Sequence, residues 1–195
     1  MKHTILSGSS RKNSTSLLVS RALERGLMEQ GEGDVEVVSF EEYDLPFFNQ
    51  DLDINNLTPF QDRLITAMRN ADSILFVIPE YNWFPSAEMV QLVHRLAETQ
   101  FKDLWNHKVF SFIGVSSGRG GRMPAVQLSY VVAKIINVFN LDSLTNPKSF
   151  EVQFAGKVLD TAGNSLGSAE FDKGLNGFLD YHIRLSVRWL SGRGR

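Results

Sequence analysis

Apolar runs and amphipathic segments alternate along most of this chain. Runs rich in β-branched and aromatic residues predict strands over 2–7, 35–40, 73–78 and 109–115, with a short last strand within 143–150. Apolar residues recur at helical spacing over 15–30, 58–70, 87–97, 125–139 and 171–189. The glycine-rich segment 156–168 is expected to be a loop. This alternation of strands and helices predicts an α/β fold.

The third and fourth predicted strands indicate the architecture. Both "SILFVI" at 73–78 and "VFSFIGV" at 109–115 are unbroken apolar runs, as found in strands that are buried on both faces. We therefore expect a three-layer, doubly wound parallel sheet of five strands. Ligands bind beyond the carboxyl ends of the strands in such sheets. The candidate loops follow strands one, three and four: "GSSRKNSTS", "PEYNWFPS" and "SSGRGGRMP".

Composition and charge narrow the class of protein. The chain has 195 residues, 43% of them hydrophobic, and a net charge of -2. We expect one globular domain over 1–190 and no nucleic-acid or membrane partner. The absence of cysteine excludes disulfides, thiolate metal sites and thiol nucleophiles, and it fits a cytoplasmic protein. No apolar run reaches the length of about 18 residues that a membrane span needs. The basic, glycine-broken segment 191–195 is expected to be a disordered tail.

The loop after the first strand offers donors for an anion. Ser9, Arg11, Ser14, Thr15 and Ser16 lie where a helix begins, and the unpaired N–H groups of a helix N-terminus favour negative charge. The loop matches neither G-x-x-x-x-G-K-[ST] nor G-x-G-x-x-G. It therefore favours a single terminal phosphate, which an arginine can hold through two parallel hydrogen bonds. A plain N-cap by Ser14, Thr15 or Ser16 is the open alternative.

The remaining polar residues form no catalytic or metal-binding pattern. Asp51 and Asp53 are expected to cap a loop, and no serine lies in a G-x-S-x-G turn. The histidines have no common spacing, and we expect structural or surface roles for all four: His3, His94, His107 and His182.

Four segments, in order along roughly residues 2–139, carry a family resemblance. "GSSRKNSTS" at 8–16 resembles the G-S-x-R-x-x-S-x-N phosphate loop of the NAD(P)H-dependent FMN reductase family. "LPFFNQDLD" at 45–53 is similar to the L-P-x-[FY]-N-x-D loop of that family, and "PEYN" at 79–82 to its second signature. "SSGRGG" at 116–121 resembles its S-x-G-x-x-G-G loop.

The resemblance implies a flavodoxin-like sheet of strand order 2-1-3-4-5 and FMN as the cofactor. The first loop would hold the phosphate. Backbone groups of Glu80, Tyr81 and Asn82 would meet the pyrimidine edge of the flavin, with Pro79 fixing the chain. The third loop would let backbone approach the ring closely, because its glycines lack Cβ atoms; its candidate residues are Ser117, Gly118, Arg119, Gly120 and Gly121. For the Glu80 carboxylate, capping the following helix or pairing with a lysine is the open alternative.

Some positions depart from the family pattern. Ser16 stands where the family has asparagine, and Trp83 where it has a small residue. Tyr81 and Trp83 would stack on or border the flavin ring, or Trp83 would pack against a neighbouring subunit. Arg119 and Arg122 would attract the phosphates of a nicotinamide nucleotide, or would be solvated loop charges.

The activity that the resemblance implies needs no catalytic side chain, since the cofactors carry the chemistry. NADPH or NADH would pass a hydride to flavin N5, and a small acceptor would then take the electrons in a ping-pong cycle. The acceptor would be a quinone, an azo compound, a flavin or a metal oxyanion. The family also implies a homodimer or homotetramer. A flavodoxin-like electron carrier and a non-enzymatic FMN-binding protein are the alternative functions.

Overall fold

A mainly parallel sheet organises the computed structural model, which describes residues 1–192. Its long strands are β1 (Lys2–Ser7), β2 (Asp34–Ser39), β3 (Ser73–Tyr81) and β5 (Val109–Val115). They lie in the order β2-β1-β3-β5, and the short strand β6 (Leu144–Thr145) lies next to β5. This order reverses direction across the sheet at β1 and β3, as in a flavodoxin-like doubly wound fold. The predicted fold class and strand order are therefore confirmed.

The last position of the sheet differs in detail from the prediction. The single strand expected within 143–150 is two short pieces, β6 (Leu144–Thr145) and β7 (Phe150–Val152), and both pair in parallel with β5. Between them the chain leaves the sheet, and the Asn146 side chain donates a hydrogen bond to the Ser111 hydroxyl at 2.9 Å. A further strand, β4 (Phe84–Pro85), pairs antiparallel with the end of β3 and was not predicted. Two-residue strands are too short to show a periodicity.

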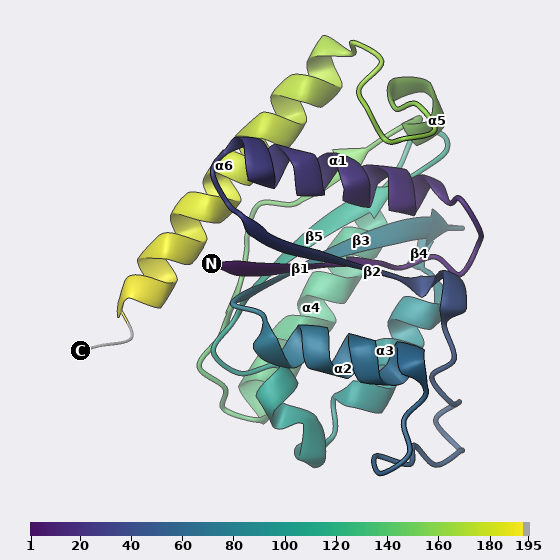
Figure 1. The fold of residues 1–195 in the computed structure, drawn as a ribbon, viewed down its shortest axis with the longest axis vertical. Coiled ribbons are helices and arrows are strands. Elements are labelled where there is room, and N and C mark those ends of the chain that lie inside the picture. The colour runs from purple at the N-terminus through teal and green to yellow at the C-terminus, as the bar shows by residue number, and fades with distance from the viewer. Residues whose placement is uncertain (193–195) are drawn as a thin grey trace.

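Helices cover both faces of the sheet (Figure 1). One face carries α1 (Thr15–Glu29) and α6 (Ala169–Ser191), and the other carries α2 (Pro59–Asn70), α3 (Ala87–Leu96) and α4 (Arg122–Val138). Successive strand residues serve opposite faces. Ile5 and Leu75 pack under α1 and α6, whereas Leu6 and Phe76 pack in the cluster beneath α2, α3 and α4.

Several helix boundaries differ from the predicted ones. α4 begins at Arg122 rather than at 125. The prediction started too late because the first turn of this helix shows little apolar periodicity. A short helix, α5 (Ala155–Val158), overlaps the segment that was predicted as a loop. Two 3-10 turns, η1 (Phe40–Glu42) and η2 (Thr99–Leu104), were not predicted. None of the helices within residues 1–192 has both the length and the apolar character to cross a membrane.

The C-terminal helix also extends beyond its predicted range of 171–189. It continues to Ser191, one residue into the predicted tail, and Gly192 follows as its C-cap. The rest of the predicted tail, 193–195, lies outside the described residues.

Candidate cofactor-binding site

The three candidate loops leave the sheet at one edge. Ser7, the last residue of β1, pairs with Val77 of β3, and Pro79 of β3 pairs with Val115, the last residue of β5. The Gly8 amide donates to the Val77 carbonyl at 2.9 Å. Because the strands are parallel and in register, their carboxyl ends place the following loops side by side.

The first loop opens into the N-terminus of α1. Ser14 is the N-cap and its side chain accepts from the Leu17 amide, so the predicted cap exists. Ser9 is only 2% exposed and Thr15 is half-buried, whereas Arg11 is exposed. The hydroxyl of Ser16 is buried, and no other group in residues 1–192 forms a hydrogen bond with it. A buried donor without a partner is costly, and here it stands in the first turn of a helix, where backbone N–H groups are also unpaired.

Two carboxylates hold the outer part of this loop, and the sequence did not indicate either of them. Glu41 accepts from the Asn13 amide at 2.6 Å. Glu88, at the start of α3, accepts a short hydrogen bond from the Ser10 hydroxyl. These contacts use donors outside the predicted phosphate-binding set. Ser86 adds a third contact, since its hydroxyl donates to the Gly8 carbonyl at 2.6 Å.

Glu88 also influences the half-buried phenol of Tyr43. Burial raises the pKa of Tyr43, and the nearby charges of Glu88 and Asp44 raise it further. Among the described residues, no group forms a hydrogen bond with the phenol oxygen.

The second loop is a tight hairpin between β3 and β4. Tyr81 pairs with Phe84, and the two residues between them, Asn82 and Trp83, have φ of 51° and 69°. Positive φ at both central positions is the geometry of a type I′ turn. A bulky residue such as tryptophan adopts it only with strain. The turn leaves the Trp83 side chain 69% exposed.

Tyr81 joins the second loop to the first. Its hydroxyl lies 3.3 Å from Ser9 Oγ, and the Arg11 guanidinium lies over its ring at 4.8 Å from the centroid. The phosphate-binding candidates Ser9 and Arg11 are thus in direct contact with a candidate from the "PEYN" segment. The contact also sets the position of the otherwise exposed arginine, because a cation is attracted to the face of an aromatic ring.

The third loop meets the second through Glu80. Gly120 and Gly121 have φ of 148° and 94°, and Gly121 is the N-cap of α4. The Glu80 carboxylate accepts a short hydrogen bond from the Gly121 amide. Of the alternatives open for Glu80, the structure shows a helix cap, but of α4 and not of the helix that follows Glu80 in the chain.

The remaining third-loop candidates lie in surroundings that differ from one another. The Gly118 amide donates to Ser116 Oγ at 3.3 Å, and Ser117 is exposed. Arg119 lines a hollow of about 540 Å³ that faces Phe154 and the start of α6. Arg122 lies 3.9 Å from Glu151, so it has a carboxylate partner of its own.

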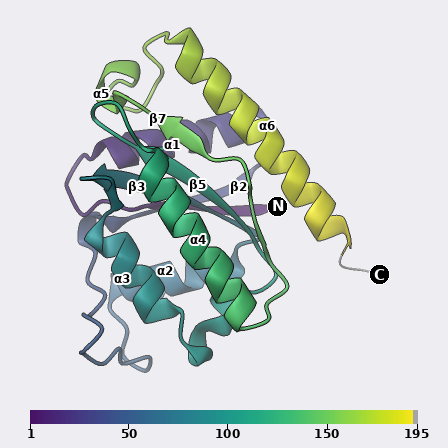
Figure 2. The same cartoon turned by 180° about the vertical axis from the view of Figure 1, so that it is seen from behind.

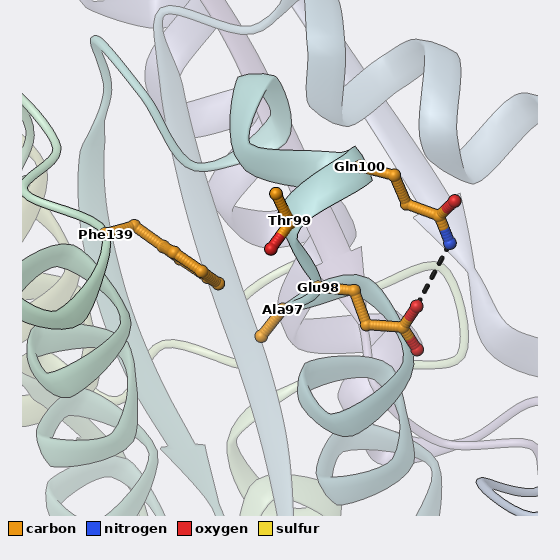
Figure 3. A pocket seen from close by; sticks show the side chains of 5 residues that line it. All are labelled: Ala97, Glu98, Thr99, Gln100 and Phe139. Atoms are coloured by element: carbon orange, nitrogen blue, oxygen red, sulfur yellow. Dashed lines mark hydrogen bonds between the residues drawn. The ribbon is translucent and has the colours of Figure 1, made fainter.

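A second cavity lies away from all three loops. Its volume is about 460 Å³, and Figure 3 shows its lining residues at the end of α3, in η2 and after α4. Glu98 in this cavity accepts from Gln100 at 3.0 Å. Helices that connect parallel strands run back along the sheet, so the ends of α3 and α4 lie at the opposite edge from the loops. None of the predicted site residues lines this cavity.

The residues of the first loop fit a terminal phosphate. Within residues 1–192 the buried Ser16 Oγ has no hydrogen-bond partner, and it stands in the first turn of α1, where a helix N-terminus favours an anion. Arg11 supplies a positive charge in the same loop. The fold and this loop define a flavodoxin-like α/β protein whose first loop offers donors for an anion.

Comparison with known proteins gives the family. Residues 1–150, which include all three loops, match the family described as NADPH-dependent FMN reductase. The chain therefore belongs to the NADPH-dependent FMN reductase family and is an NAD(P)H-dependent flavin oxidoreductase. The family confirms the cofactor and co-substrate predicted from the motifs, FMN and NAD(P)H. No curated protein matches the chain.

Solved structures share the fold. The flavoenzyme NAD(P)H:(acceptor) oxidoreductase FerB from Paracoccus denitrificans aligns with a TM-score of 0.74 at 21% identity, over 100% of this chain and 99% of that chain. The apo form of the NADH:FMN oxidoreductase EMOB aligns with a TM-score of 0.60 at 16% identity, over 94% and 89%. An azoreductase from Bacillus anthracis aligns with a TM-score of 0.54 at 14% identity, over 96% and 100%.

Proposed function

We propose that the three loops form the FMN site and that the enzyme transfers electrons from NAD(P)H to a small acceptor by a ping-pong mechanism. The observation that carries the proposal is the buried, unpartnered hydroxyl of Ser16 beside the first turn of α1. With Ser9, Arg11, Ser14 and Thr15, it would hold the phosphate. When bound, FMN supplies the redox chemistry, taking a hydride from the nicotinamide and giving electrons to the acceptor.

The protein residues contribute position rather than proton transfer. Pro79 to Trp83 and Ser117 to Gly121 would border the ring, and the glycines of the third loop allow backbone groups to approach it. Tyr81 ties the phosphate loop to this ring end through Ser9 and Arg11. Holding two rings in contact needs a rigid cradle more than a general acid or base.

The acceptor class that we propose is a small planar or inorganic oxidant: a quinone, an azo compound, a free flavin or a metal oxyanion. Support comes from the exposed Trp83 at the hairpin, which leaves an aromatic surface beside the site. Such a surface suits planar aromatic acceptors.

We also propose that the enzyme is a homodimer or homotetramer. Exposed apolar side chains occur on β4 and on α4, which pack against each other: Phe84, Met123, Val126 and Tyr130. Figure 2 shows α4 running along the outside of the molecule, next to α3. A second copy is the partner that would cover these residues. Sedimentation equilibrium of the wild type and of Tyr130→Glu tests this, and a monomeric wild type would contradict it.

A cytoplasmic location stays a prediction from the cysteine-free composition.

Anaerobic mixing with NADPH or NADH tests the enzymatic proposal. Protein reconstituted with FMN should lose its visible flavin absorbance on the order of seconds or faster, as typical turnover rates require. The absorbance should return when a quinone is added after the nicotinamide nucleotide has been removed. Bound flavin that does not bleach would favour an electron carrier or a non-enzymatic binding protein. Protein that takes up no FMN would contradict the cofactor site itself.

A further inference from the structure

Glu80 bridges two loops that the sequence separates by about forty residues. It is the last but one residue of β3, and its carboxylate accepts from the amide of Gly121, 41 positions later. The backbone around it is shaped to admit the carboxylate. A Cβ on Gly120 would overlap the Glu80 carboxylate, so the glycine lets the carboxylate take this position.

The capping of α4 depends on this contact. The helices α1, α2, α3 and α6 each have an N-cap side chain of their own: Ser14, Thr58, Ser86 and Ser168. The N-cap of α4 is Gly121, with no side-chain hydrogen bond from the cap residue and no acidic residue in the first turn. The Glu80 carboxylate supplies from another loop both the acceptor and the negative charge that a helix N-terminus favours.

The backbone of the third loop packs closely against β5. A Cβ on Gly114 of β5 would lie 1.6 Å from the Gly121 carbonyl oxygen. The strand therefore lies directly against the start of α4, and Glu80 accepts from the amide of the same glycine. Loss of the Glu80 contact would free Gly121 on the side that faces the second loop.

We propose that Glu80 is a positioning residue that fixes the second and third loops into one cradle for the ring end of FMN. The inference rests on the proposed function, since it assumes that these loops border the ring. Its side chain acts through Gly121 and not on a substrate. A charge-assisted hydrogen bond is stronger than a neutral one, so it can hold the third loop in place. The variant Glu80→Gln retains an acceptor oxygen at this position.

The first test uses the protein without flavin. Hydrogen exchange of the Gly121 amide, followed by NMR, should be slow in the wild type and in Glu80→Gln. In Glu80→Ala it should be faster by about tenfold or more, the factor that a hydrogen bond to a charged group typically contributes. Equal exchange in the wild type and in Glu80→Ala would overturn the proposal. Glu151→Ala is the matched control, because Glu151 is also half-buried but contacts Arg122 and not Gly121.

The second test compares FMN with riboflavin, which lacks the phosphate. Glu80→Ala should weaken the binding of both ligands by the same factor, about tenfold, and Glu80→Gln should restore most of the loss. Glu151→Ala should bind both ligands as the wild type does. Unchanged affinity of Glu80→Ala would overturn the positioning role while the cofactor site stands. If wild-type protein binds neither ligand, the proposed function fails, and the exchange experiment still decides whether Glu80 holds Gly121.

Discussion

His3 Nδ1 and His182 Nε2 lie 3.3 Å apart, although 179 positions separate the two residues in the chain. The Ser73 hydroxyl contacts both rings, at 2.6 Å from His3 Nδ1 and 3.2 Å from His182 Nε2. Ser111 Oγ lies 2.9 Å from His182 Nδ1. These buried contacts connect β1 with α6 by way of serines on β3 and β5. They confirm the structural role expected for His3 and His182.

This histidine pair should make stability depend on pH. Burial lowers the pKa of His182 to about 3, with a further contribution from His3. Burial also lowers the pKa of His3, opposed by the hydrogen bond and charge of Glu32. Both groups bind protons more readily in the unfolded chain. The contribution of the two histidines to the free energy of unfolding is therefore complete above their unfolded pKa of about 6.5. It is lost as the pH falls towards their pKa values in the folded protein.

Urea unfolding between pH 8 and pH 4.5 measures this effect. Each histidine should contribute a slope of up to about 1.4 kcal/mol per pH unit below pH 6.5. His182→Gln should flatten the profile, whereas His94→Gln, at an exposed position, should leave it unchanged. A profile that is the same in His182→Gln and in the wild type would contradict the assignment.

Arg11→Ala should weaken FMN binding by about 1.5–3 kcal/mol, the usual loss for a hydrogen bond to a charged group. Riboflavin binding should change much less, because the arginine acts on the phosphate. Fluorescence titration of the two ligands gives the comparison, with Arg188→Ala, at an exposed position on α6, as the control. An equal loss for both ligands would mean that Arg11 acts through Tyr81, over whose ring it lies.

Ser16→Ala should separate binding from stability. The Ser16 hydroxyl is buried without a partner, so its removal should leave the melting temperature of the flavin-free protein unchanged or raise it. FMN affinity should fall by about 1.5 kcal/mol, roughly tenfold. Ser186→Ala removes another buried, unpartnered hydroxyl, on α6, and should not alter FMN affinity. The same affinity in both variants would show that Ser16 is not a phosphate ligand.

Gly114→Ala should disrupt the packing of β5 against the start of α4, whereas Gly118→Ala should leave the fold stable. A Cβ at Gly114 meets the Gly121 carbonyl oxygen, while one at Gly118 meets nothing within 4 Å. The clash involves backbone on both sides and cannot be relieved by a rotamer change. We expect Gly114→Ala to lose about 3 kcal/mol or more of unfolding free energy and to lose FMN binding. Chemical denaturation of both variants checks this, and comparable stability would refute the close contact.

Much of the site could be predicted from the sequence because it depends on interactions between residues that are close together in the chain. Ser14 follows a strand and precedes an apolar helical pattern, so its role as an N-cap depends on near neighbours alone. The paired strands β1, β3 and β5 follow from apolar runs, and their parallel arrangement implies which loops share an edge. Phe47 and Phe48 are exposed, and the sequence does not predict this because an apolar residue in a loop carries no signal of what covers it.

Sequence by itself determined the layers, the strand order of the family and the loops at the carboxyl edge, because these depend on periodicity and on short motifs. Only the tertiary structure decided that Glu80 caps α4 and that His3 meets His182. Both contacts join residues far apart in the chain through the packing of strands and helices. The energy of such contacts depends on a geometry that exists only after the sheet has formed, so no local pattern records them.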